Sequence, residues 1–207
     1  MRIPGHRWRA GLGLLGFLIM LAGLAALPLS TPYLRECRPW VQALRARMRG
    51  ASFLGESETI LQAGGNDCGA ACLAMILEAH GLAYNLQDLT RRLGTSPKGT
   101  SMLNLRLLSA RLGIPARSWF LGDADLSTVP LPAIAFLRGR HFVVMRRLVA
   151  PGVLEVDDPA LGRLRWPVRS FRGAWPGQAL VFDPEWSPPP GFANVRHSSS
   201  VSNNNLP

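Results

Sequence analysis

The sequence predicts an α+β domain, in which helices pack on an antiparallel sheet, preceded by one transmembrane helix. Three observations lead to this fold class. A charge-free apolar run occupies residues 10–29, helix-type segments follow between residues 66 and 113, and strand-type runs begin only after residue 115. Helices grouped before an antiparallel sheet are typical of the α+β class.

The apolar run, AGLGLLGFLIMLAGLAALPL, follows a basic N-terminus of residues 1–9. About 20 apolar residues at 1.5 Å per residue span a hydrocarbon core of about 30 Å. A signal peptide usually has a shorter apolar run, of about 7–15 residues. We therefore favour an uncleaved anchor, although the small residues near Ala25 and Ala26 also fit a cleavage site.

Arginines flank both ends of this run, so the positive-inside rule does not assign its orientation. A short basic N-terminus before a first apolar helix is the usual form of an export signal. We therefore expect a single-pass protein of the bacterial inner membrane, with its domain exported (periplasmic) rather than cytoplasmic.

The remaining chain divides into three parts. Residues 30–57 form a basic, partly helical linker, residues 58–184 carry the compact elements, and residues 185–207 form a polar tail that we expect to be disordered. A length of 207 residues allows one domain with an appendage, and 47% apolar residues exclude a wholly disordered chain.

Three helices and five strands are predicted within residues 58–184. The helices begin at capping side chains and end at glycines. Their limits are Asn66 or Asp67 to Gly81, Asn85 to Gly94, and Thr100 or Ser101 to Gly113. The strand-type runs are ARSWFL, PAIAFL, HFVVMRRL, VLEVDD and QALVF, and VRSFRGAW has the pattern of a short helix.

The formal net charge is +10, and Lys98 is the only lysine among the 23 basic residues. A strongly positive charge of this kind first suggests a protein that binds nucleic acid. The arginines are spread from Arg2 to Arg196, however, and no basic stripe alternates with stacking aromatic residues. We interpret the charge as a coding bias together with membrane-proximal charge, and we expect no nucleic-acid partner.

Cys68 lies in the first turn of the first, buried helix, where the helix dipole favours a thiolate. The chain has only two other cysteines, Cys37 and Cys72, and an odd count of three is no disulfide framework. A lone cysteine is most often a small buried apolar residue. Cys68 by itself therefore does not indicate an enzyme.

Three further residues accompany this thiol. Gln62 precedes it across the loop AGGND and can supply an amide beside the backbone N–H of Cys68, as an oxyanion hole requires. His141 opens the strand HFVVM, and Asp158 ends the next strand, so adjacent antiparallel strands would place carboxylate beside imidazole. Each of these residues, taken alone, has an ordinary structural explanation. All four in this order and in these elements are much less expected by chance.

The segments QAGGNDCGAACLAMIL, LPAIAFL, HFVVM and DDPALG resemble the C39 peptidases. These are papain-like cysteine proteases that remove double-glycine leader peptides from bacteriocin-type precursors. The resemblance extends from about residue 59 to residue 184 and implies a papain-like fold. It implies that Cys68 is the nucleophile, His141 the general base, Asp158 its orienting carboxylate and Gln62 the oxyanion donor. It favours Asp158 over Asp157 because a proline follows Asp158.

Most members of this family are the N-terminal part of an ATP-driven exporter, but this chain contains no GxxxxGK[ST] motif. We therefore expect a stand-alone member whose partners are a precursor with a Gly-Gly leader and a separate exporter, ABC-type or other. Stand-alone relatives also occur with secretion systems for other small proteins, including amyloid subunits.

These observations predict a cysteine endopeptidase that cleaves after Gly-Gly and needs no cofactor or metal. The alternative is a non-catalytic module that binds the leader and delivers the precursor to an exporter. A metal site formed by Cys68, Cys72 and His80 is rejected, because His80 lies about 12 Å from Cys72 along the helix axis at 1.5 Å per residue.

Overall fold

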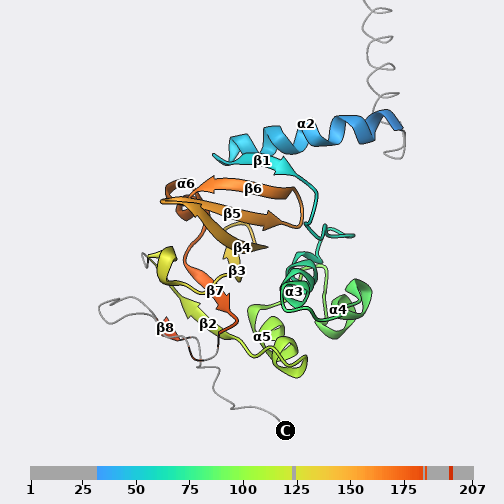
Figure 1. Cartoon of the computed structure of the whole chain (residues 1–207). Helices are drawn as coiled ribbons and strands as arrows, with labels where there is room; N and C mark the ends of the chain where they lie inside the picture. The colour runs from blue at the N-terminus through green and yellow to red at the C-terminus, as the bar shows by residue number, and fades with distance from the viewer. Residues whose placement is uncertain (1–31, 123–124, 184, 186–195, 198–207) are drawn as a thin grey trace, which may run out of the picture. The chain divides into compact units, whose positions relative to one another are not determined.

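The computed structural model describes residues 32–122, 125–183, 185 and 196–197 (Figure 1). The chain divides into two compact units, residues 1–41 and 42–207, and helix α2, Pro32–Met48, crosses their boundary. The other described elements belong to the second unit. In chain order they are β1 (Ser52–Gly55), α3 (Cys68–Ala79), α4 (Leu86–Arg92), α5 (Met102–Arg111), β2 (Arg117–Phe120), the 3-10 helix η1 (Leu126–Thr128), β3 (Ala133–Leu137), β4 (His141–Ala150), β5 (Val153–Asp158), β6 (Gly162–Pro167), α6 (Val168–Ala174), β7 (Gln178–Val181) and β8 (Arg196–His197).

The described helices do not include one that is long and apolar enough to cross a membrane. The predicted anchor, residues 10–29, lies outside the described residues, together with the basic N-terminus of residues 1–9. Of the predicted polar tail, residues 185–207, only residue 185 and strand β8 are described. The anchor and the tail therefore stay predictions.

An eight-stranded sheet forms the centre of the second unit, in the order β1-β6-β5-β4-β3-β7-β2-β8. All of its neighbouring strands are antiparallel, which confirms the predicted α+β class. Strand β1 lies within the stretch that the sequence indicates as a linker, and it pairs with β6, which was not predicted as a strand. Strands β4 and β5 are interior neighbours, and each carries one candidate site residue.

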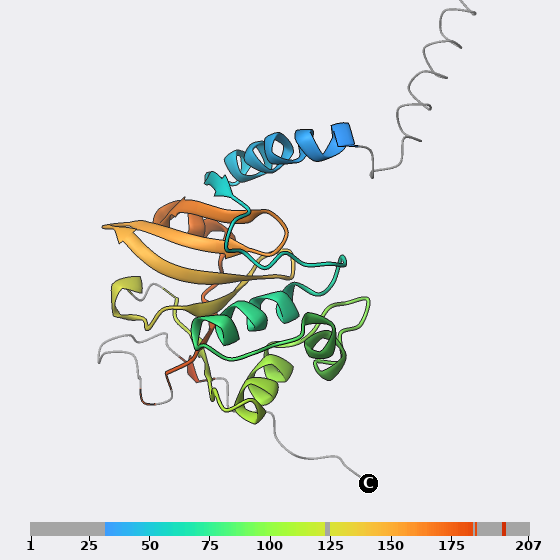
Figure 2. The same cartoon turned by 45° about the vertical axis from the view of Figure 1, so that its right-hand side comes forward.

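Side chains alternate between the two faces of this sheet, as expected for strands. Helices α3, α4 and α5 cover one face (Figure 2), where Ile134, Phe142 and Leu180 pack among the helix side chains. On the other face, a second core contains Trp166 of β6, Phe171 of α6 and residues of other strands. The sheet thus separates two apolar cores, and α3 is the helix buried against it.

The predicted helix limits agree closely with the structure. Asn85 and Ser101 are N-caps whose side chains accept hydrogen bonds from backbone N–H groups three residues later. Glycines with positive φ follow each of the three helices, as expected for left-handed helix ends: Gly81 (φ 69), Gly94 (φ 59) and Gly113 (φ 86). One capping prediction is wrong. Asp67 is the N-cap of α3 but makes no side-chain capping bond, because its carboxylate instead accepts hydrogen bonds from the backbone of residues 63 and 64.

Candidate active site

The candidate site forms where three element ends meet. Cys68 is the first residue of α3, His141 is the first residue of β4, and Asp158 is the last residue of β5. Strands β4 and β5 are paired, and α3 packs against β4. The topology therefore brings together residues that are far apart along the chain.

The imidazole and the carboxylate are hydrogen-bonded to each other. His141 Nε2 lies 2.7 Å from Asp158 Oδ1, and the Asp158 side chain is fully buried. The same oxygen accepts a hydrogen bond of 2.8 Å from the backbone N–H of Ala160. A carboxylate on Nε2 holds the proton on that nitrogen, which leaves Nδ1 as the nitrogen for the thiol.

The thiol of Cys68 is buried and hydrogen-bonds to His141. Burial alone disfavours a thiolate. The hydrogen bond with His141, together with backbone hydrogen bonds from Phe142 and Gly69, outweighs burial and lowers the pKa of the Cys68 thiol. The hydrogen bonds to Cys68, with His141 first among them, therefore favour the nucleophilic form of sulfur.

His141 shows the complementary shift. Burial disfavours the imidazolium, but hydrogen bonds with Asp158 and Cys68, reinforced by their charges, raise the pKa of His141 from 6.5 to about 9. The two shifts have the same consequence, because both favour a thiolate–imidazolium pair near neutral pH.

Cys72 lies one helical turn further along α3 and is fully buried. Burial, with smaller contributions from the charges of Cys68 and the two aspartates, raises the pKa of its thiol well above the usual value. Two thiols on one helix therefore have opposite character, and only Cys68 has the environment of a nucleophile.

Gln62 is held by a loop that folds back before α3. Its Nε2 donates a 2.7 Å hydrogen bond to the carbonyl of Gly64, while its backbone N–H donates to the carbonyl of Pro159 at 2.9 Å. The second contact ties this segment to the residue that follows Asp158. An amide nitrogen carries two hydrogens, and this bond uses one of them.

The two adjacent aspartates have different partners. Asp157 accepts hydrogen bonds from Thr59, Arg146 and Arg163, whereas Asp158 binds His141. Neighbouring residues of a strand point to opposite faces, which separates the two carboxylates.

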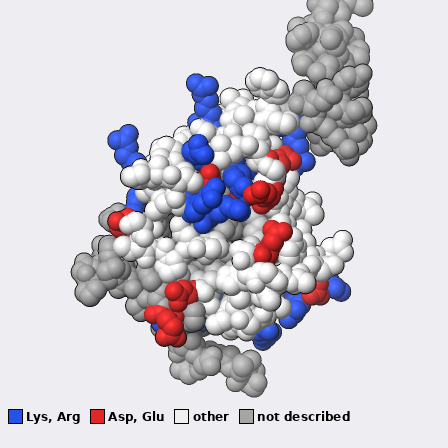
Figure 3. Space-filling view, in the orientation of Figure 1, with Lys and Arg blue, Asp and Glu red and all other residues white. Residues whose placement is uncertain are grey.

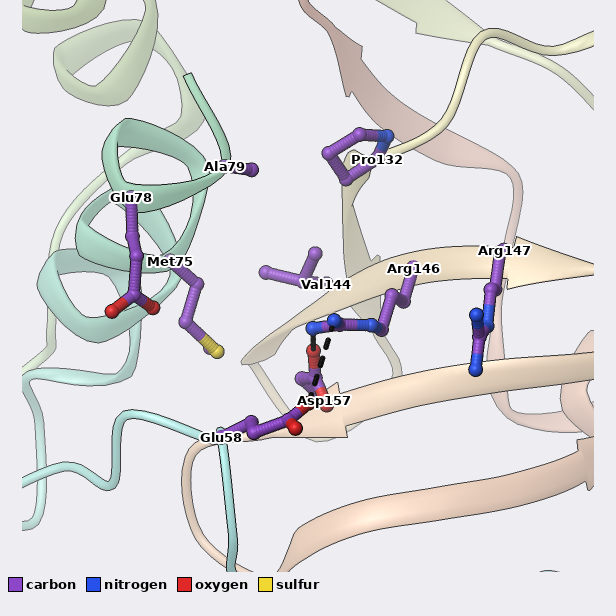
Figure 4. Close-up of a pocket in the computed structure, with 9 residues that line it drawn as sticks. All are labelled: Glu58, Met75, Glu78, Ala79, Pro132, Val144, Arg146, Arg147 and Asp157. Carbon is purple, nitrogen blue, oxygen red and sulfur yellow. Dashed lines mark hydrogen bonds and ion pairs between the residues drawn. The ribbon is translucent and has the colours of Figure 1, made fainter. Parts of the chain in front are cut away.

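A pocket of about 530 Å³ opens between α3 and strands β4 and β5 (Figure 4). Of the α3 residues that line this pocket, Met75 is the nearest to Cys68. It lies about 10 Å from Cys68 along the helix axis at 1.5 Å per residue. Arg146 crosses the pocket to Glu58 at 3.6 Å and Asp157 at 3.1 Å, so opposite charges are paired there. The space-filling view likewise shows basic and acidic groups side by side near the middle of the face drawn in Figure 3.

Among the described residues, no group of three or more His, Cys, Asp or Glu side chains is arranged to hold a metal ion.

One residue of the site was not predicted. The guanidinium of Arg49, which lies just after α2, contacts Asp158 Oδ2 at 3.2 Å. The two residues are separated by 109 positions, and no local sequence pattern connects them.

Comparisons with known proteins show which family and which relatives this chain resembles. The sequence model of the peptidase C39 family matches residues 56–187. The lactococcin-G-processing and transport ATP-binding protein LagD of Lactococcus lactis is 32% identical over 142 residues, which is 66% of this chain and 20% of that protein. The probable functional amyloid protease FapD of Pseudomonas aeruginosa is 36% identical over 126 residues, which is 56% of this chain and 54% of that protein.

Among solved structures, a double glycine motif protease from an AMS/PCAT transporter, in complex with the leader peptide, superimposes with a TM-score of 0.55. The two chains are 26% identical, and the match covers 60% of this chain and 89% of the other.

Proposed function

The chain belongs to the peptidase C39 family, and from this premise we propose that it is a cysteine endopeptidase that cleaves its substrate after a Gly-Gly motif. The observation that carries the proposal is the hydrogen-bonded series of Cys68 thiol, His141 imidazole and Asp158 carboxylate. Binding a leader without cleaving it would need neither the shifted thiol nor the imidazole.

In the proposed reaction, the Cys68 thiolate attacks the carbonyl carbon of the second glycine. The oxyanion of the tetrahedral intermediate accepts hydrogen bonds from the Gln62 amide and from the backbone N–H of Cys68. His141 then donates its proton to the leaving amine, and a thioester remains on sulfur. Water, deprotonated by His141, hydrolyses this thioester and restores the thiolate–imidazolium pair.

We propose that the substrate is the precursor of a secreted bacteriocin-like or other small exported protein. Two glycines lack Cβ atoms and can pass through a cleft too narrow for other residues. The double glycine motif protease in complex with its leader peptide supports a leader-peptide substrate, LagD supports a bacteriocin-like one through its processing of lactococcin G, and FapD extends the range to amyloid proteins. A separate exporter as partner and an inner-membrane location through residues 10–29 complete the proposal.

The test uses the full chain and a synthetic precursor segment that contains Gly-Gly, with products identified by mass spectrometry. We expect one cut after the second glycine, no cut when both glycines are replaced by alanine, and none with Cys68→Ala. Cys72→Ala is the matched control and should retain cleavage. Activity in folded Cys68→Ala protein would refute the thiol mechanism, and tight binding of the peptide without any cleavage by the wild-type chain would favour the delivery module.

A further inference from the structure

Arg49 contacts the buried carboxylate from a position outside the part of the chain that matches the peptidase family. The family match begins at residue 56, whereas Arg49 directly follows the last residue of α2. Its Nη1 lies 3.2 Å from Asp158 Oδ2, where its side chain is 44% exposed and that of Asp158 is fully buried. A half-exposed cation therefore contacts an anion that has no access to solvent.

The backbone around Arg49 is held in place on both sides. Ala46 is fully buried, and its carbonyl accepts hydrogen bonds from the N–H groups of Arg49 at 3.0 Å and Ala51 at 2.9 Å. Gly50 has φ +75 and passes close to Ser170, so that a Cβ there would lie 3.2 Å from the Ser170 Cβ. The turn from α2 into β1 thus fixes the point from which the guanidinium extends.

The contact completes the hydrogen bonding of Asp158. Oδ1 is engaged by His141 and by the N–H of Ala160, and Arg49 engages Oδ2. A buried carboxylate is costly unless its oxygens have partners, and a charged donor is a strong one. With both oxygens held, rotation of the carboxylate away from the imidazole is opposed.

We propose that Arg49 is a positioning residue for the reaction, one that acts through Asp158. This inference rests on the proposed function. Arg49 keeps Oδ1 directed at His141, and its positive charge partly offsets the attraction of Asp158 for the imidazolium. His141 can then release its proton to the leaving amine more readily than it would beside an uncompensated carboxylate.

The experiment compares the wild-type full chain with Arg49→Gln, Arg49→Lys and Arg47→Gln. Gln keeps a hydrogen-bond donor but removes the charge, Lys keeps the charge, and Arg47 is an exposed control two residues away. For Arg49→Gln we expect kcat on the Gly-Gly peptide to fall about tenfold with little change in KM, because a charged hydrogen bond on the orienting group is lost. The alkaline limb of the kcat profile should move to higher pH, whereas Arg49→Lys and Arg47→Gln should keep the wild-type limb.

A second measurement does not depend on proteolysis. Alkylation of Cys68 by iodoacetamide, followed by mass spectrometry so that each cysteine is counted separately, reports the pH at which the imidazolium loses its proton. An upward shift of that step in Arg49→Gln supports the proposal even if no peptide is cleaved, in which case only the proposed function fails. If Arg49→Gln and Arg47→Gln give the same kcat and the same alkylation profile, or if the step moves to lower pH, the role of Arg49 is refuted.

Discussion

Replacing Asp158 by asparagine should weaken the thiolate–imidazolium pair. Asparagine keeps the size of the side chain but removes the charge that faces His141 Nε2 at 2.7 Å. Burial disfavours the imidazolium, so without the carboxylate the pKa of His141 should fall back toward its ordinary value or below it.

The size of the effect follows from the shift. The difference between 6.5 and about 9 corresponds to about 3 kcal/mol of preference for the imidazolium. Asp158 and Cys68 both contribute to it. Each unit by which the loss of Asp158 lowers the pKa of His141 shifts the equilibrium about tenfold from the ion pair toward the neutral pair.

Two assays measure this loss. The wild-type kcat on the Gly-Gly peptide should rise with deprotonation of the Cys68 thiol and decline as pH passes about 9, where His141 loses its proton. In Asp158→Asn the alkaline limb should move to lower pH, and the step in the Cys68 alkylation profile that reports loss of the imidazolium proton should move down with it, by about one pH unit or more. Asp157→Asn removes a neighbouring charge that does not contact His141 and should leave both profiles in place. An unchanged alkaline limb in folded Asp158→Asn protein would refute the electrostatic reasoning.

The remaining predictions concern the second thiol, the oxyanion and the start of α3. Iodoacetamide should label Cys68 and spare Cys72 in the native chain, because burial keeps the second thiol protonated; equal labelling would contradict this. Gln62→Ala should lower kcat about 10²–10³-fold with little change in KM, the usual effect of losing an oxyanion donor, and an unaltered kcat would remove Gln62 from the mechanism. Gly69→Ala should destabilise the fold by about 1–3 kcal/mol, measured by urea unfolding, because its Cβ would lie 2.4 Å from Thr100 Cγ2. Thr100→Ser removes that methyl group and keeps the hydroxyl, so the double variant should recover much of the loss.

The helices and most strands were predictable because their signals are local. Asn85 and Ser101 cap through their own side chains, and each helix ends at a nearby glycine. Strand β6 was not predicted because arginines interrupt its sequence, GRLRWP. Its buried residues Leu164 and Trp166 nevertheless alternate with these arginines, as expected for a strand. Strand β1 has only four residues, and its pairing partner lies more than 100 positions away.

The candidate site shows the same division between local and distant information. Cys68 and His141 sit at the starts of elements that the sequence indicates, so their positions were expected, and the structure brings them into contact. The environment of Asp67 was not foreseen, because its carboxylate binds the preceding loop rather than its own helix. Arg49 could not be predicted, since its contact with Asp158 depends on how α2 ends against the finished sheet.

Strand β1 and the turn before it have a practical consequence for producing this protein. A recombinant fragment that begins where the family match begins, at residue 56, would omit residues 52–55 and leave the outer side of β6 without its partner. An unprotected strand edge invites association with other copies, so such a fragment would be prone to aggregate. Expression boundaries are therefore better placed at or before residue 42, where the second compact unit begins.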